Sequence, residues 1–189
     1  MLKKLIGESA FKLSGWKYDV KPDVLEDKQV IVGFEHTSIM DGILSIALFQ
    51  IYDIKIHTLI KKELFKGPMK PILEALGGIA VDRKAKGDVV SQMVKHFEEN
   101  EKFNLVIAPE ATRAARGEAR RPIRTGFWHI AKAANVPIVC MYANSLTKQG
   151  GIFAKIYPSN LDDDLELMQK LYKEHTGLDI VIPKRKTRL

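Results

Sequence analysis

Short apolar runs rich in β-branched residues alternate with amphipathic segments along most of the chain. The apolar runs predict strands at residues 29–34, 54–60, 78–81, 104–108, 137–143 and 152–157. The segments between them repeat apolar residues at three- and four-residue spacing, which predicts helices at residues 42–52, 69–76, 88–99, 125–134 and 161–174. Strands that alternate with helices are typical of the α/β class, so we predict one α/β domain.

The first 18 residues form a segment of their own, in which apolar residues such as Leu5, Phe11 and Trp16 alternate with lysines. A helix of this kind either lies in a lipid interface or packs on the surface of its own domain. We therefore expect an amphipathic segment over residues 1–18 and the main domain over residues 19–189. The longest stretch without a charge falls short of the roughly 18 apolar residues that a spanning helix needs, so any membrane contact is expected to be peripheral.

The composition narrows the range of partners. Hydrophobic residues make up 46% and charged residues 28% of the 189 residues, which is typical of a folded globular protein. A net charge of +7 favours anionic partners, namely nucleic acid, anionic lipid headgroups or phosphorylated substrates. Cys140 is the single cysteine, which fits a reducing, cytoplasmic compartment. It lies in the apolar run PIVCMY and is predicted to be a core residue rather than a nucleophile.

His36 follows the first apolar run after one residue, Glu35, at the end of a predicted buried strand, where α/β proteins place active sites. Inside one helix, His36 and Asp41 would point about 140° apart, so they can meet only if His36 precedes the helix and Asp41 lies in its first turn. The carboxylate would then fix the imidazole tautomer and leave the other nitrogen free as a general base. The alternative is that Ser38 and Asp41 form a capping box without catalytic meaning.

A glycine pair, Gly77 and Gly78, precedes a short apolar run that is followed by Arg83. One interpretation is a close backbone approach followed by a phosphate-binding arginine. The alternative is a helix stop and an exposed arginine.

A third group of candidate residues follows the run at 104–108, where Glu110, Thr112 and Arg113 come in quick succession. The segment from 110 to 124 contains five arginines and two glutamates. Planar guanidinium groups bind phosphate through paired hydrogen bonds, so this segment predicts a phosphate site, with a solvated basic loop as the alternative.

Several familiar motifs are missing from the sequence: the G-x-S-x-G elbow of serine hydrolases, the G-x-x-x-x-G-K-[ST] phosphate loop and the G-x-G-x-x-G dinucleotide fingerprint. One cysteine and five scattered histidines give no zinc-ligand spacing, so no metal is expected. Aromatic residues are only 8% and do not interleave with the arginines, which disfavours single-stranded nucleic acid as a partner.

Taken in order, these motifs resemble those of the glycerolipid acyltransferase family, which includes the bacterial 1-acyl-glycerol-3-phosphate acyltransferases. The matching blocks are H-x4-D at His36–Asp41, the second block at residues 61–83, PEATR at 109–113 for E-G-T-R, and VPIVCMY at 136–142 for the closing V-P-I-V block. Ala111 stands where the family usually has glycine, and Cys140 replaces a frequent proline.

The resemblance implies a single α/β domain with a mixed, mostly parallel central sheet flanked by helices. It implies that His36 takes the proton from an acceptor hydroxyl, which attacks an acyl thioester directly, while Asp41 holds the imidazole ring. The substrate-binding residues that it implies are Lys61, Arg83, Glu110, Thr112 and Arg113, with the three cations on the phosphate of the acceptor.

The implied activity moves a fatty acyl group from acyl-CoA or acyl carrier protein to lysophosphatidic acid or a related glycerol-phosphate acceptor, in phospholipid biosynthesis. No cofactor is expected, because the acyl thioester is a co-substrate. We expect the protein at the cytoplasmic, inner face of a membrane, against an anionic surface. Two alternatives stay open: a catalytically degenerate basic module that binds membrane or RNA on the same scaffold, and an acyltransferase for a different lipid acceptor.

Overall fold

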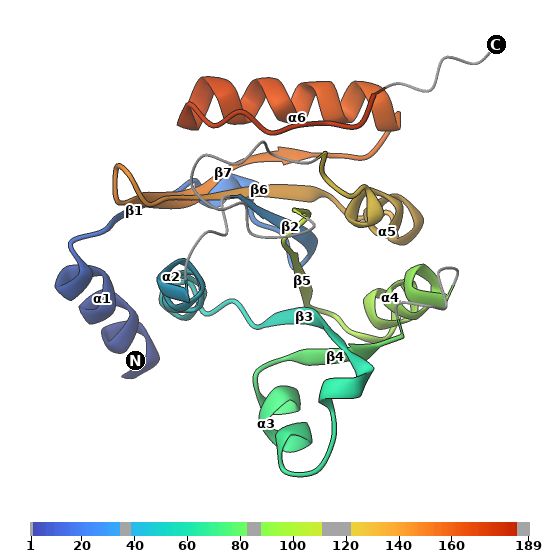
Figure 1. Cartoon of the computed structure of the whole chain (residues 1–189), viewed down its shortest axis with the longest axis horizontal. Coiled ribbons are helices and arrows are strands. Elements are labelled where there is room, and N and C mark those ends of the chain that lie inside the picture. The colour runs from blue at the N-terminus through green and yellow to red at the C-terminus, as the bar shows by residue number, and fades with distance from the viewer. Residues whose placement is uncertain (1, 35–38, 83–87, 111–121, 185–189) are drawn as a thin grey trace.

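The structure is a computed structural model that describes residues 2–34, 39–82, 88–110 and 122–184. Within these ranges, seven strands form one sheet in the order β1-β7-β6-β2-β5-β3-β4 (Figure 1). The strands are β1 (Lys17–Val20), β2 (Lys28–Phe34), β3 (Ile56–Lys61), β4 (Gly78–Val81), β5 (Phe103–Ile107), β6 (Ile138–Asn144) and β7 (Gln149–Ile156). β6 and β7 are antiparallel and the other neighbours are parallel. The predicted mixed, mostly parallel sheet is confirmed.

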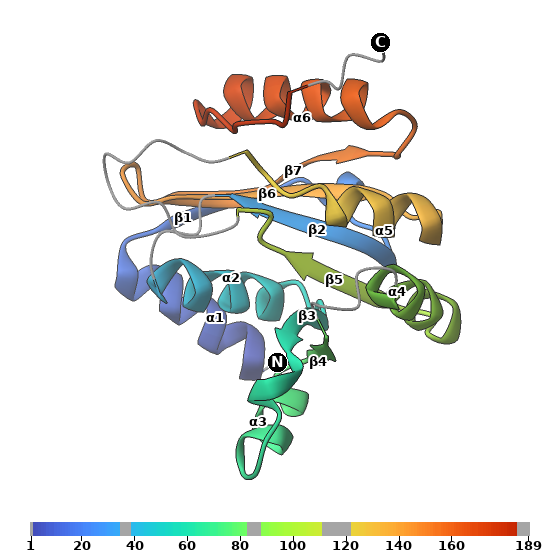
Figure 2. The ribbon, with the colours of Figure 1, turned by 45° about the vertical axis from the view of Figure 1, so that its right-hand side comes forward.

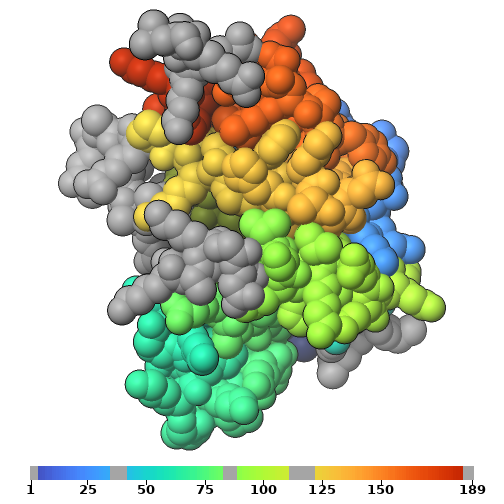
Figure 3. Space-filling view, turned by 90° about the vertical axis from the view of Figure 1, so that its right-hand side faces the viewer, coloured from blue at the N-terminus to red at the C-terminus, as the bar shows by residue number. Residues whose placement is uncertain are grey.

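Helices cover both faces of the sheet (Figures 1 and 2). The α-helices are α1 (Leu2–Ser14), α2 (Ile39–Ile51), α3 (Met69–Ala75), α4 (Asp88–Glu99), α5 (Gly126–Ala134) and α6 (Leu161–Thr176), and short 3-10 turns span Pro22–Val24 and Lys62–Leu64. α1 and α2 pack on one face, and α4, α5 and α6 pack on the other. Figure 3 shows α4 and α5 side by side between α6 and the α3 region.

β2 lies at the centre and is buried on both faces. Val30, Val32 and Phe34 belong to the core beneath α4, α5 and α6, and Ile31 belongs to the core beneath α1 and α2. This explains why the apolar run has no polar alternation, since parallel strands between two helical layers are apolar throughout.

The predicted elements are present with small shifts at their ends, and β1 was not predicted. α2 begins at Ile39 instead of residue 42, so that Asp41 lies in its first turn. β1 escaped the sequence analysis because it has only four residues, of which only Val20 is buried, and because it pairs with β7 alone at the edge of the sheet.

α1 packs closely against α2. Phe11 is buried in the core cluster of that face, and a Cβ at Gly7 would lie only 2.7 Å from the carbonyl oxygen of Ala47. Leu5, Ile6 and Leu13 are exposed on the same helix. α1 therefore has one face in the core and an apolar surface outside it, and the proposed domain boundary after residue 18 stays a prediction.

A hydrogen bond between two buried side-chain amides joins the central strands. Gln29 Nε2 donates to Asn104 Oδ1 at 2.7 Å, where these two residues face each other in the β2–β5 ladder. Asn104 Nδ2 in turn donates to the carbonyl of Lys55, directly before β3, at 3.2 Å. The two amides thus fix the register of three strands at their amino ends.

Replacing both amides should cost less than the sum of the two single replacements. Gln29→Leu or Asn104→Leu leaves the other buried amide without its partner, and each should lower the free energy of unfolding by about 1–3 kcal/mol. The double variant should lose clearly less than the sum of the two single losses, with a coupling of about 1 kcal/mol in a urea-unfolding double-mutant cycle. Strictly additive losses would contradict a direct energetic link between the amides.

Candidate active site

The carboxyl ends of β2, β5, β3 and β4 lie along one edge of the sheet, because these four strands are consecutive neighbours and parallel. The sequence candidates occur at these ends: His36 follows β2, Glu110 follows β5, Lys61 is the last residue of β3, and Arg83 follows β4. Neighbouring strands are about 4.8 Å apart, so the ends of β2 and β4 are separated by roughly 14 Å. The topology therefore brings the four chain segments to one edge.

The structure describes only part of the candidate set. Lys61 is exposed, Glu110 is half-buried, and the backbone of Asp41 lies in the first turn of α2. His36, Arg83, Thr112 and Arg113 lie outside the described residues. The pairing of His36 with Asp41 and the phosphate contacts thus stay predictions.

A cleft of about 680 Å³ runs between α2 and the turn that follows α3, from the amino end of β3 to the carboxyl ends of β2 and β5. Phe34 and Gly42 both line it, and they flank the segment 35–41 that carries the H-x4-D block. Ala108, two residues before Glu110, lines it as well. The cleft therefore reaches the ends of the segments that contain the predicted catalytic residues.

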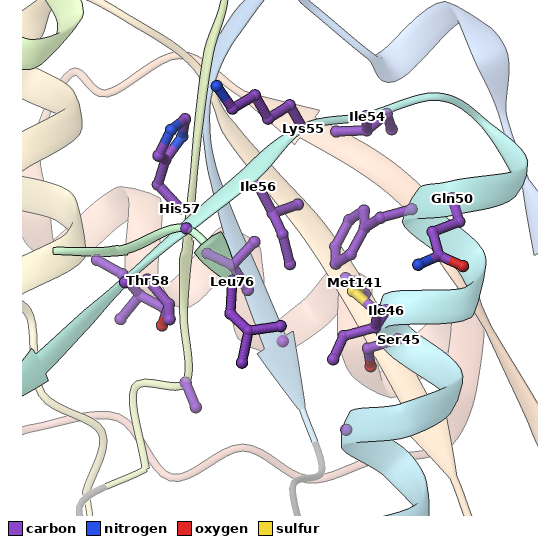
Figure 4. Close-up of a pocket in the computed structure, with 18 of the residues that line it drawn as sticks. Ser45, Ile46, Gln50, Ile54, Lys55, Ile56, His57, Thr58, Leu76 and Met141 are labelled. Atoms are coloured by element: carbon purple, nitrogen blue, oxygen red, sulfur yellow. The ribbon is translucent and has the colours of Figure 1, made fainter. Parts of the chain in front are cut away.

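The walls of the cleft are largely apolar. In Figure 4 the side chains of Ile46, Ile56, Leu76 and Met141 face a common space. The polar side chains among its lining residues include Ser45, Gln50 and Thr58. The lining follows α2 from residue 42 to residue 50, a length of about 12 Å at 1.5 Å per residue, so the cleft suits an extended apolar ligand.

Gly33 leaves the floor of this cleft open. A Cβ built on Gly33 meets no heavy atom within 4 Å, although the flanking residues Val32 and Phe34 are buried. Glycine weakens a strand and is used where another group must come close, so the sequence did carry a signal at this position. This signal was not used, because the run at residues 29–34 was interpreted only as a buried strand.

The glycine pair Gly77–Gly78 is explained by backbone packing. Gly77 has a φ of +79°, and a Cβ there would overlap the carbonyl oxygen of Ile56 in β3. A Cβ on Gly78 would lie 2.7 Å from the carbonyl oxygen of Leu73. The glycines therefore end α3 and let its turn pack against β3, as in the helix-stop interpretation, whereas the role of Arg83 stays a prediction.

His57 lies beside the cleft, but its ring points to the other side of β3 (Figure 4). It stacks on Phe103 with ring centroids 4.4 Å apart. Burial, together with the nearby charge of Lys55, lowers the pKa of His57 below its ordinary value. His57 is therefore a neutral packing residue at neutral pH and not a base for the cleft.

Cys140 is fully buried in the core, as the sequence analysis predicted. Burial raises the pKa of its thiol to about 12. Because Cys140 is the single cysteine of the chain, no accessible cysteine thiolate exists to carry an acyl group.

In the part of the chain that the structure describes, no three His, Cys, Asp or Glu side chains are grouped as around a metal ion. In the same ranges, no helix has the length and apolar character needed to cross a bilayer.

The comparison with known families agrees with this architecture. The sequence matches the family described as Acyltransferase over residues 17–144. The chain belongs to the acyltransferase family. The matched region of this acyltransferase contains β1 to β6 and all the predicted site residues.

Solved structures show the same fold. The acyltransferase superposes on the crystal structure of the 1-acyl-sn-glycerophosphate (LPA) acyltransferase PlsC from Thermotoga maritima with a TM-score of 0.62. The match covers 93% of this chain and 79% of that one, at 16% sequence identity. No curated protein sequence gave a significant match. The predicted fold class is thus confirmed.

The buried thiol gives a direct check on the core. Native acyltransferase should not react with a thiol reagent such as DTNB, because Cys140 is inaccessible and its pKa is raised to about 12. After unfolding in guanidinium chloride, one thiol per chain should react. Rapid reaction of the native protein would show that Cys140 is not buried in solution.

Proposed function

We propose that this acyltransferase transfers a fatty acyl group from acyl-CoA or acyl carrier protein to a hydroxyl of lysophosphatidic acid or a related glycerol-phosphate acceptor, in phospholipid biosynthesis. The observation that carries the proposal is the apolar cleft whose lining residues Phe34 and Gly42 flank the H-x4-D block. An acyl chain in this cleft would have its thioester end beside the predicted base.

The chemistry needs one base and no covalent intermediate on the enzyme. In the proposed step, His36 removes the proton of the acceptor hydroxyl as its oxygen attacks the thioester carbon, while Asp41 stabilises the imidazolium. The C–S bond then breaks, and the proton passes from His36 to the leaving thiolate. The burial of Cys140 supports this direct transfer, because an acyl-cysteine intermediate has no accessible thiolate.

The acceptor site would lie along the neighbouring strand ends. Lys61, Arg83 and Arg113 are proposed to bind the phosphate, and Glu110 and Thr112 to shape the pocket around the glycerol. Binding of the phosphate would supply energy that positions the nearby hydroxyl for reaction. The net charge of +7 supports a phosphorylated acceptor and a peripheral place on the anionic inner face of a membrane.

The role of the base can be tested directly. His36→Ala should reduce thiol release from acyl-CoA or acyl carrier protein by at least about 100-fold, because general-base catalysis contributes on that order. The matched control for His36→Ala is His129→Ala, which removes an exposed histidine on α5 and should leave turnover unchanged. The same assay, run on the unmodified protein with lysolipids that have or lack a phosphate, identifies the acceptor. Turnover of His36→Ala near that of the unmodified protein would remove His36 from the mechanism.

The role of the cleft can be tested at Gly33. Gly33→Leu should leave the melting temperature nearly unchanged, because the new side chain enters open space, while the KM for a long-chain acyl donor rises at least about tenfold. Gly126→Leu is the control, since a Cβ there also meets nothing within 4 Å but Gly126 lies on α5, outside the cleft. An unchanged KM for Gly33→Leu would mean that the acyl chain binds elsewhere.

A further inference from the structure

Exposed apolar side chains gather on residues 62–76 between β3 and β4, which we call the α3 segment. The side chains of Leu64, Met69, Ile72 and Leu76 are 56%, 47%, 51% and 61% exposed. Met69, Ile72 and Leu76 are spaced by three and four residues, so they share one side of α3 and its last turn. A helix with an apolar surface of this kind is incompletely covered by its own protein.

Lysines flank this apolar surface. Lys62, Lys66 and Lys70 of the α3 segment are exposed, and Lys61 directly precedes it. Two glutamates, Glu63 and Glu74, oppose these four cations, so the region is basic. Apolar side chains bordered by lysines are typical of segments that lie in the interface of an anionic bilayer, where the long lysine side chains reach the headgroups.

The apolar surface continues to the mouth of the cleft. Leu76 both lines the cleft and is exposed, and the same is true of Ile46 on α2. Ile43, one turn before Ile46, is exposed as well. Figure 4 shows Leu76 and Ile46 facing each other across the cleft. An acyl chain that entered between them from a bilayer would remain in apolar surroundings.

The helix farthest from the α3 segment, α6, carries an excess of acidic residues. In Figures 1 and 2, α6 lies at the far end from α3. α6 contains five acidic residues against Lys170 and Lys173. Comparing the two helical segments alone, an anionic surface would therefore attract the α3 segment more strongly than α6.

We propose that the α3 segment, together with Ile43 and Ile46, docks the protein on an anionic lipid bilayer, with the mouth of the cleft against the lipid. The purpose of this docking, the direct passage of lipid into the cleft, rests on the proposed function. The docking surface itself is measurable without turnover.

Vesicle sedimentation tests the surface with matched variants. The protein is mixed with vesicles of an equal mixture of phosphatidylglycerol and phosphatidylcholine, and with vesicles of phosphatidylcholine alone. The unmodified protein should bind the anionic vesicles more tightly. Met69→Ser combined with Ile72→Ser should weaken binding at least about tenfold, as should Lys70→Glu, which replaces an attraction by a repulsion.

The controls lie on α6. Lys170→Glu matches Lys70→Glu closely, because Lys70–Glu74 and Lys170–Glu174 are both 3.9 Å ion pairs of exposed side chains. Leu167→Ser removes an exposed leucine from the same helix. Both controls should bind vesicles like the unmodified protein, and thermal melts should show that every variant is folded.

Either of two results would overturn the docking surface: no binding of the unmodified protein to anionic vesicles, or full binding by the α3 variants. Loss of binding only in a Leu5→Ser, Ile6→Ser variant would also overturn it, because it would assign the contact to α1.

A parallel assay separates this proposal from the proposed function. The α3 variants should keep turnover on a detergent-dispersed acceptor and lose it on a vesicle-embedded one. If the protein binds vesicles as expected but shows no turnover on either the detergent-dispersed or the vesicle-embedded acceptor, the docking surface is supported and the proposed activity is rejected.

Discussion

The hydrogen bond between the buried amides of Gln29 and Asn104 fixes how the central strands are aligned. Apolar contacts alone would also allow other alignments of such strands, but a slip of one residue would break this bond and turn every side chain to the opposite face. With β2, β5 and β3 held in register at their amino ends, their carboxyl ends follow from strand length. The edge that carries the candidate residues thus depends on an interaction at the far side of the sheet.

Much of this architecture could be predicted because it is local. The run that forms β2 and the spacing that forms α4 are properties of consecutive residues, and β4 and α4 begin and end at the predicted residues. β1 is different, since its four residues are stabilised by β7, more than 100 positions away. The apolar runs also predicted that the segments with the candidate residues follow β2, β4 and β5. The cleft could not be predicted from the sequence, because it is the space between elements that are distant along the chain, namely α2, β3 and the turn after α3.

The polar and the apolar residues of the candidate site lie in two adjoining parts of the fold. The strand ends supply segments with an imidazole, carboxylates and guanidinium groups, whereas the adjoining cleft offers side chains such as Ile56 and Met141. The proposed reaction, between a charged headgroup and a hydrocarbon chain, would need both environments close together. Gly33 lies on β2, three residues before His36, so the open floor of the cleft ends close to the predicted base.

The order of the strands has a consequence for synthesis. β1 pairs with β7, and β2 pairs with β6. During synthesis, β1 and β2 therefore emerge well before these partner strands. Until residues 138–156 have emerged, the apolar strand β2 lacks one neighbour, and an unpaired strand edge is prone to join another chain. The nascent chain therefore exposes this strand edge until β6 has formed, and a chain truncated before β6 is expected to aggregate.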